Sequence, residues 1–186
     1  MDWKVITRAV RKLPLLVLLT SLVTRAQEAP TSEFDVEAAC LYHFAEFVTW
    51  PPETFAAPDS PIIIGILGDD PLGAALETTI KNKTFDGHPF QILRLDTKSL
   101  SGIRRCHILF IGASERRRIP EILDRLQKAP VLTVSRVDRF VQLGGMVHFL
   151  LEGKRVRFEI DDDRAKKAGL RISSKLMRLA RPREGS

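Results

Sequence analysis

Apolar and polar positions follow two alternating periods in the middle of the chain. PIIIGILGDD is a β-branched run closed by glycine and aspartate, whereas the following PLGAALETTIKNK places Leu72, Leu76 and Ile80 at helical spacing. The predicted elements of this region are a strand at 61–70, a helix at 71–83, strands at 89–95 and 107–114, a helix at 120–128 and a strand at 130–136. Strands that are apolar at nearly every position, alternating with amphipathic helices, indicate an α/β fold in which helices flank a mostly parallel sheet.

The C-terminal part of the chain has a different pattern. Two strand-like runs lie within residues 144–160, and the second alternates apolar with charged positions, which predicts a C-terminal antiparallel hairpin with one solvated face. Short terminal helices are expected after it. Aspartates 161–163 suit the start of the first helix and Gly169 its end, while Ser173 or Ser174 suits the N-terminal cap of the second.

The first 26 residues have the pattern of a secretory signal peptide. Basic residues precede an apolar run from Leu13 to Val23, and cleavage is expected after Ala26. The run is shorter than the roughly 20 residues that a membrane-spanning helix needs, and an uncleaved anchor is the alternative. The predicted organisation is a signal peptide 1–26, a linker 27–33, a single α/β domain 34–180 and a tail 181–186.

Removal of the signal peptide changes the charge of the protein. The segment carries five Lys/Arg and one acidic residue, so the net charge falls from +6 to +2. The basic excess therefore comes partly from the targeting segment, and we expect no nucleic-acid partner. Eight Lys/Arg between residues 164 and 183 either favour proximity to an anionic membrane surface or lie on solvated helix faces.

The two cysteines, Cys40 and Cys106, have two interpretations in an exported protein. Thiols in an oxidising compartment tend to pair, which would give one intramolecular disulfide. Two buried thiols are the other interpretation. Cys40 lies on a predicted helix and Cys106 directly precedes a predicted strand, so the spacing does not decide between them.

Motifs for catalysis or cofactor binding are not found in the sequence. Gly65-x-x-Gly68 lacks the further glycine of a dinucleotide fingerprint and the Gly-Lys-Ser/Thr of a phosphate loop. The four histidines do not have metal-binding spacing. The aspartates at 69–70 and 161–163 stand where helices begin, and capping explains them better than paired-carboxylate catalysis. We expect no enzyme, no cofactor and no metal site.

Four arginines follow predicted strands at their carboxyl ends. Arg116, Arg117 and Arg118 come after one strand and Arg136 comes after the next. The carboxyl ends of parallel strands meet at one edge of a sheet, where α/β proteins bind their ligands. These arginines predict a binding site for a phosphate or carboxylate, with solvated loop charges as the alternative.

The segment LYHFAEFVTWPP (41–52) concentrates aromatic residues in a predicted helix that ends at two prolines. Its apolar surface is wider than one core face needs, with Phe47 on the flank and Trp50 further round. One interpretation is a helix buried on two sides. The other is that Tyr42, Phe47 and Trp50 contact another protein chain, since aromatic residues are favoured interface anchors.

Three segments resemble the successive signature blocks of the YfiR family: EAACLYHFAEFVTWP, CHILFIGAS and VLTVSRVDRFVQLGGMVHFLLEGKRVRFEIDDDRAKKAGLRISSKLMRLA. Their order and spacing match from about Glu37 to Ala180. The resemblance implies a periplasmic, Rossmann-like α/β domain, often dimeric. It further implies repression of an inner-membrane diguanylate cyclase of the YfiN type through its periplasmic portion. Arg136 departs from the family pattern, which has an acidic residue after Ser135.

Two functions of different classes follow. In the first, the mature domain is a regulatory binding protein that represses the cyclase by protein–protein contact and thereby lowers cyclic di-GMP. In the second, the domain is a periplasmic small-molecule sensor or carrier with an anion at the strand-end arginines. Both can operate in one protein, because a bound ligand can change the affinity for a partner.

Overall fold

The computed structural model describes residues 32–69 and 71–182, all of which lie in one compact unit. The predicted signal peptide, most of the predicted linker and residues 183–186 lie outside the described residues. Within residues 32–69 and 71–182, no helix is long and apolar enough to cross a membrane.

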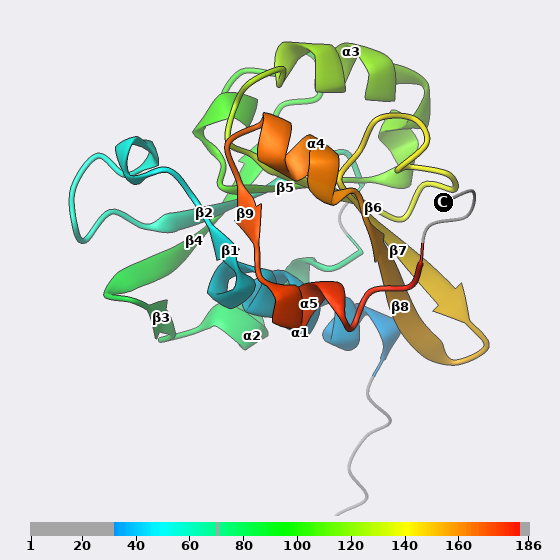
Figure 1. Ribbon diagram of the computed structural model, residues 1–186, viewed down its shortest axis with the longest axis horizontal. Helices are drawn as coiled ribbons and strands as arrows, with labels where there is room; N and C mark the ends of the chain where they lie inside the picture. Colours follow the sequence, from blue (N-terminus) through cyan, green and yellow to red (C-terminus); the bar gives the residue numbers. More distant parts are fainter. Residues whose placement is uncertain (1–31, 70, 183–186) are drawn as a thin grey trace, which may run out of the picture. The chain divides into compact units, whose positions relative to one another are not determined.

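The chain alternates strands and helices, as the sequence pattern predicts (Figure 1). The α-helices are α1 Glu33–Phe47, α2 Gly73–Ile80, α3 Ile119–Arg125, α4 Asp162–Lys167 and α5 Ser174–Met177. The strands are β1 Val48–Thr49, β2 Ile62–Leu67, β3 Thr84–Phe85, β4 His88–Leu95, β5 Ile108–Ile111, β6 Leu132–Ser135, β7 Val147–Glu152, β8 Arg155–Ile160 and β9 Arg171–Ile172. Three 3₁₀ helices are η1 Pro52–Thr54, η2 Ile103–Arg105 and η3 Ala113–Arg118.

The main sheet has seven strands in the order β3-β4-β2-β5-β6-β7-β8, and β1 pairs with β9 in a separate two-stranded sheet. Strands β4, β2, β5, β6 and β7 are parallel, while β3 and β8 pair antiparallel at the two edges. Counted along the chain, the five parallel strands have the order 2-1-3-4-5. This is the flavodoxin-like order of a doubly wound sheet, and it differs from the 3-2-1-4-5-6 order of the Rossmann fold.

Apolar side chains on both faces of the sheet build two core clusters. In β5, Ile108 and Phe110 point to the cluster that α1, α2 and α5 cover, whereas Leu109 and Ile111 point to the cluster that α3 covers. Figure 1 shows α3 on the opposite side of the sheet from α1, α2 and α5. The near-continuous apolar character of the central strands follows from this burial on two faces.

Local sequence signals set the ends of the first helix. Ser32 and Asp35 form a reciprocal capping box, in which the Asp35 carboxylate accepts from the Ser32 backbone at 2.8 Å and Ser32 Oγ accepts from the Asp35 backbone at 3.1 Å. Val48 is extended, so the chain leaves the helix there and enters β1 before the two prolines. Phe44, in the interior of the helix, is 1% exposed and stacks on Phe149 with 5.8 Å between ring centroids.

Capping residues also define the C-terminal elements. Asp161 caps α4 by accepting a hydrogen bond from the Arg164 backbone at 3.0 Å, and Gly169 has a φ of +83° just beyond the helix. Ser173 caps α5 by accepting from the Lys175 backbone. The chain after α5 returns to the sheet, where Arg181 bridges to Glu159 on the outer side of β8.

Candidate functional site

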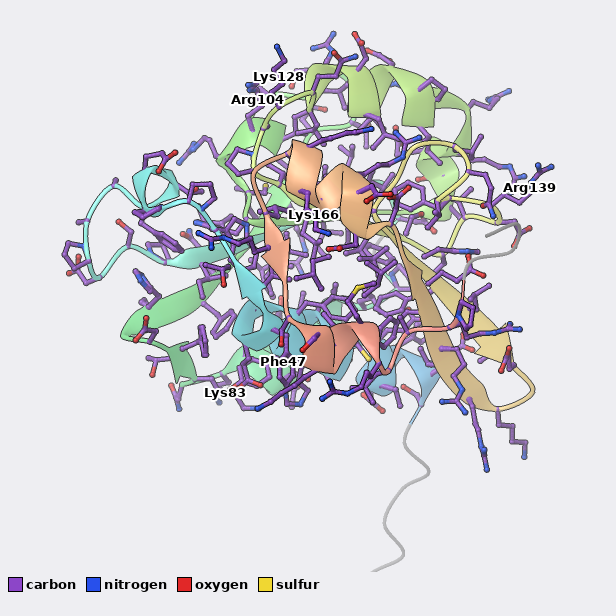
Figure 2. All side chains as sticks on the ribbon, in the orientation of Figure 1. Phe47, Lys83, Arg104, Lys128, Arg139 and Lys166 are labelled. Carbon is purple, nitrogen blue, oxygen red and sulfur yellow. The ribbon has the colours of Figure 1, made fainter. Side chains whose placement is uncertain are left out.

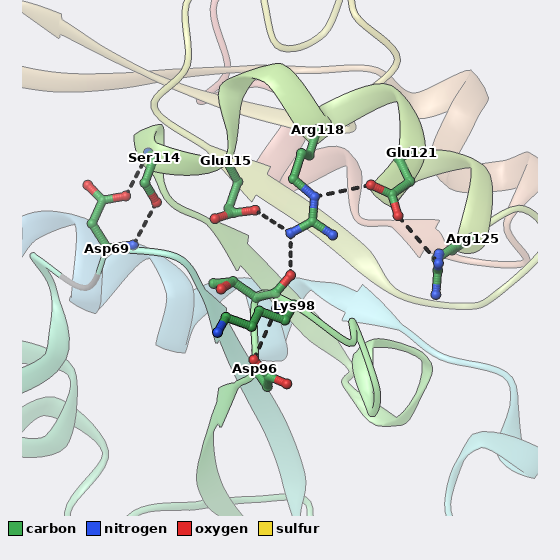
Figure 3. Close-up of polar contacts among 9 residues, drawn as sticks. Asp69, Asp96, Lys98, Ser114, Glu115, Arg118, Glu121 and Arg125 are labelled. Carbon is green, nitrogen blue, oxygen red and sulfur yellow. Dashed lines mark hydrogen bonds and ion pairs between the residues drawn. The ribbon is translucent and has the colours of Figure 1, made fainter.

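The carboxyl ends of β2 and β5 mark the point where the strand order reverses, which is where doubly wound folds bind ligands. We call residues 68–69, 112–118 and 135–136 the strand-end edge. Two reciprocal hydrogen bonds close it: the Asp69 backbone donates to Ser114 Oγ at 3.0 Å, and the Ser114 backbone donates to the Asp69 carboxylate at 2.9 Å (Figure 3). The second bond lowers the pKa of Asp69.

Glycines allow the two loops of the strand-end edge to touch. Gly68 has a φ of +88°, and a Cβ there would lie 2.5 Å from Ser114 Oγ. A Cβ on Gly112 would collide with the Asp69 carboxylate and lie 2.6 Å from its backbone oxygen. The backbone and carboxylate of Asp69 therefore lie directly against the loop that begins at Gly112.

Arg118 is committed to protein groups. Its guanidinium pairs with Glu115 and with Glu121, each at 3.1 Å, and it also donates to the Thr97 carbonyl (Figure 3). The carboxylate of Glu121 in turn pairs with Arg125 at 3.3 Å. The chain from η3 into α3 therefore neutralises the arginine that sequence reasoning assigned to an anion.

The other predicted arginines point to different partners. Arg116 lies 3.8 Å from Asp138, and Arg117 is exposed with no hydrogen-bond or ion-pair partner among the described residues. Arg136 pairs with Glu33 at 2.8 Å and with Glu37 at 3.2 Å, both on α1.

The pairing of Arg136 with α1 is partly buried. The side chain of Arg136 is 28% exposed and Glu37 as a residue is 2% exposed. Burial raises the pKa of Glu37 to about 7, although the Arg136 charge favours the ionised form. One Glu37 oxygen has no hydrogen-bond partner among the described groups. The four arginines thus do not converge on a common anion site.

Trp50 does not belong to an interaction surface. It is 7% exposed, and its indole Nε1 donates to the His107 carbonyl at 3.1 Å. The ring also meets the His107 ring edge-on, with centroids 5.8 Å apart. The prediction of Trp50 as a partner-binding residue is therefore wrong, because the chain turns after α1 and carries the indole into the core.

Tyr42 and Phe47 are half-buried on α1. Tyr42 packs against Phe90, and the Lys83 ammonium lies 4.2 Å from the centre of its ring. The Phe47 carbonyl accepts from the Ser173 backbone, and its ring packs against the edge of the first core cluster. Figure 2 shows Phe47 beside α5. These two aromatics keep part of their surface in solvent, and their contact with another chain stays a prediction.

Cys40 and Cys106 are both free thiols, so the structure has the two unpaired thiols of the second interpretation and not the disulfide of the first. Cys40 packs against the cluster under α1, while Cys106 belongs to the cluster under α3, on the other face of the sheet. Burial raises the pKa of Cys40 to about 11 and that of Cys106 to about 12. Both thiols therefore stay protonated and are weak nucleophiles.

The buried histidines do not form a metal site. Among residues 32–69 and 71–182, no three His, Cys, Asp or Glu side chains come together as metal ligands. His107 Nδ1 accepts from the Ile63 backbone at 3.0 Å, and burial lowers its pKa to about 4. His148 lies 3.8 Å from Glu159, and burial lowers its pKa also. Both imidazoles act as neutral interior groups.

A groove that sequence reasoning missed lies between α3 and α4, with a volume of about 640 Å³. Its apolar lining residues are Leu123, Leu126, Leu143, Met146 and Ala168. Its basic lining residues are Lys128, Arg164 and Lys167. We call this site the α3–α4 groove. No local sequence motif predicts this groove, because its walls come from three segments that are separate in the sequence: 120–128, 143–146 and 164–168.

The fold defines the class of this protein as a mixed α/β domain with a mostly parallel seven-stranded sheet flanked by helices. A model of the YfiR/HmsC-like family matches residues 34–181, and the chain belongs to this family. The family is regulatory, acts in the periplasm and works with diguanylate cyclases. This agrees with the family resemblance of the three sequence blocks.

The structure is also similar to a crystal structure of a conserved domain protein from Vibrio cholerae O1 biovar El Tor. The TM-score is 0.58 and the sequence identity is 10%. The likeness covers 80% of this chain and 59% of that protein, so this chain spans less than two thirds of its length. At this identity the similarity shows a shared fold and nothing further.

Proposed function

We propose that the mature domain is exported to the periplasm and represses an inner-membrane diguanylate cyclase by binding its periplasmic portion. The observation that carries this proposal is the family match over residues 34–181. The closed strand-end edge supports it, because a regulator that acts by occupancy needs a surface and not a reaction centre. Binding favours the inactive conformation of the cyclase, and cyclic di-GMP falls.

The first test measures intracellular cyclic di-GMP in the native host. Deletion of the gene should raise cyclic di-GMP, and the full chain should restore the original level. A chain without residues 1–26 should fail to restore it, because the protein then stays in the wrong compartment. An unchanged level after deletion, in cells shown to make the protein, would refute cyclase repression.

The contact surface is proposed to include Tyr42 and Phe47, the two predicted interface residues that keep solvent exposure. Phe47→Asp should lose repression while the purified protein keeps its circular dichroism and cooperative unfolding. Leu151→Asp is the matched control, since Leu151 is 51% exposed and lies on β7, away from the end of α1. Repression by a folded Phe47→Asp variant would exclude Phe47 from the interface.

The same proposal includes a homodimer, in line with the family resemblance. Sedimentation of the purified mature protein at several concentrations tests it. A single monomeric species throughout would remove the dimer from the mechanism but leave the repression result intact.

A further inference from the structure

The α3–α4 groove combines an apolar interior with positive charge. Its volume of about 640 Å³ falls within the range of about 300 to 1,000 Å³ that small-molecule sites occupy. Leu143, one of the apolar lining residues, is 44% exposed, whereas Leu126 in the same lining is 6% exposed. An apolar side chain left open inside a concave site is available to a ligand that carries an apolar group.

The charges around the groove are unbalanced. Lys128 and Lys167 have no ion-pair partner among the described residues, and Arg164 shares its charge with Asp161 at 3.3 Å. Asp124 is the acidic residue of the lining, and the Gln127 amide holds its carboxylate at 2.6 Å. Figure 2 shows Lys128 on the α3 side of the molecule. An anionic group entering the groove would find basic side chains that the protein does not neutralise itself.

The loop that carries Leu143 is held in place by its own backbone. Leu143 N donates to the Arg139 carbonyl at 2.9 Å, and Gly145 N donates to the Phe140 carbonyl at 2.9 Å. Gly144 has a φ of +109°, and a Cβ there would lie 3.3 Å from Leu123 and 3.4 Å from Arg164. The glycine thus lets the loop approach both walls, so the groove is formed before any ligand arrives.

We propose that the α3–α4 groove binds a small amphipathic anion, a carboxylate on an unbranched apolar chain. The chain packs on Leu143, Leu123 and Met146, and the carboxylate lies between Lys128 and Lys167. This inference goes beyond cyclase repression and does not depend on it. It also moves the predicted anion site away from the strand-end edge, where Arg118 and Arg136 pair with carboxylates of the protein.

Octanoate tests the proposal by isothermal titration calorimetry with the protein purified from the periplasm. Octanoate should bind at one site per chain and raise the unfolding temperature. Acetate, which lacks the apolar chain, should bind at least tenfold more weakly. Octyltrimethylammonium, which has the chain and the opposite charge, should not compete with octanoate. Equal binding of the cation would overturn the charge assignment and the proposal with it.

Paired variants locate the site. Lys128→Glu combined with Lys167→Glu should weaken octanoate binding at least tenfold. Lys154→Glu combined with Arg155→Glu makes the same change of charge at the exposed turn between β7 and β8, and should leave binding unchanged. Leu143→Asp should abolish binding, with Leu151→Asp as its control. Equal weakening by both members of either pair would show non-specific attraction and refute the groove as the site.

Vesicles of phosphatidylglycerol separate a soluble ligand from a membrane surface. The wild-type protein should bind octanoate whether or not vesicles are present. Binding to vesicles without binding of octanoate would make the basic groove a membrane contact and overturn the proposal. Neither result changes what is expected for cyclic di-GMP after gene deletion. Cyclase repression and ligand binding in the groove can therefore be refuted independently.

Discussion

The strand-end edge and the α3–α4 groove both contain several basic residues, yet they differ in whether carboxylates of the protein pair with these residues. At the strand-end edge, Arg118 meets Glu115 and Glu121, and Arg136 meets carboxylates of α1. In the groove, Lys128 and Lys167 meet no carboxylate among the described residues. Arg118 and Arg136 are therefore paired by the protein's own carboxylates, whereas Lys128 and Lys167 keep charges that are available to a ligand.

This difference predicts opposite responses to mutation in the two regions. Removing one member of a buried pair leaves an uncompensated charge, which is strongly destabilising. Removing an exposed, unpaired lysine changes stability little. Mutations at the strand-end edge should therefore lower the unfolding free energy of the protein. Mutations of the groove lysines should instead weaken ligand binding.

The largest effect is expected for Arg136→Ala. The variant leaves the buried Glu37 without its cation, and we expect a loss of about 3 kcal/mol in unfolding free energy at pH 7. The ability of Glu37 to take a proton keeps the loss at the lower end of the range for buried pairs. Urea unfolding followed by circular dichroism measures it.

Arg117→Ala is the control for this variant, because Arg117 is exposed and has no partner among the described residues. It should change the unfolding free energy by less than about 0.5 kcal/mol. Equal losses in the two variants would mean that the pairing with α1 does not stabilise the fold, and the contrast between the regions would fail.

The second effect is a pH dependence that Glu37 imposes. Its pKa of about 7 in the folded protein lies above its ordinary value of 4.5, so the folded state binds more protons between these values. Stability must then fall as pH rises from about 5 to 8, by about 2.5 kcal/mol from this group alone. Glu37→Gln should remove that fall, measured as unfolding free energy at a series of pH values.

The comparison of wild type with Glu37→Gln is needed because His107 acts in the other direction. Its pKa of about 4 lies below the ordinary 6.5, so this group adds stability as the pH rises from about 4 to 6.5. The difference between the two proteins cancels the histidine contribution. A difference curve that is flat from pH 5 to 8 would show that Glu37 ionises as freely in the folded protein as in the unfolded chain.

The architecture could be predicted because each main element has a local signal. β2 and β5 are short apolar runs, and α2 has apolar residues at helical spacing, so strand and helix alternate visibly. Strands β1, β3 and β9 have two residues each, too few for any period to show. The strand order was also out of reach, since it depends on contacts between distant segments.

The candidate site was less predictable for the same reason. Arg136 and Glu33 form a hydrogen-bonded pair but are 103 residues apart in the chain. Trp50 follows the helix pattern at a position that looks peripheral, yet the extended segment after the helix carries it into the core. Charge and aromatic content can be read locally, whereas the partner of each group is set by tertiary structure.

The smallest effect completes the comparison. Lys128→Ala and Lys167→Ala should each change the unfolding free energy by less than about 0.5 kcal/mol, because neither ammonium has an ion-pair partner to lose. Lys166→Ala is the matched control on α4, since Lys166 pairs with Asp162 at 2.6 Å in an exposed position where such pairs contribute at most about 1 kcal/mol. Urea unfolding of all three variants measures the effects side by side.

A combined loss above about 1 kcal/mol for Lys128→Ala with Lys167→Ala would exceed what unpaired surface charges can contribute. The two lysines would then stabilise the fold through contacts with other groups, and the groove would resemble the strand-end edge. Near-zero losses together with weaker octanoate binding would have the opposite meaning. Lysines whose replacement leaves the unfolding free energy unchanged but weakens octanoate binding belong to a ligand site.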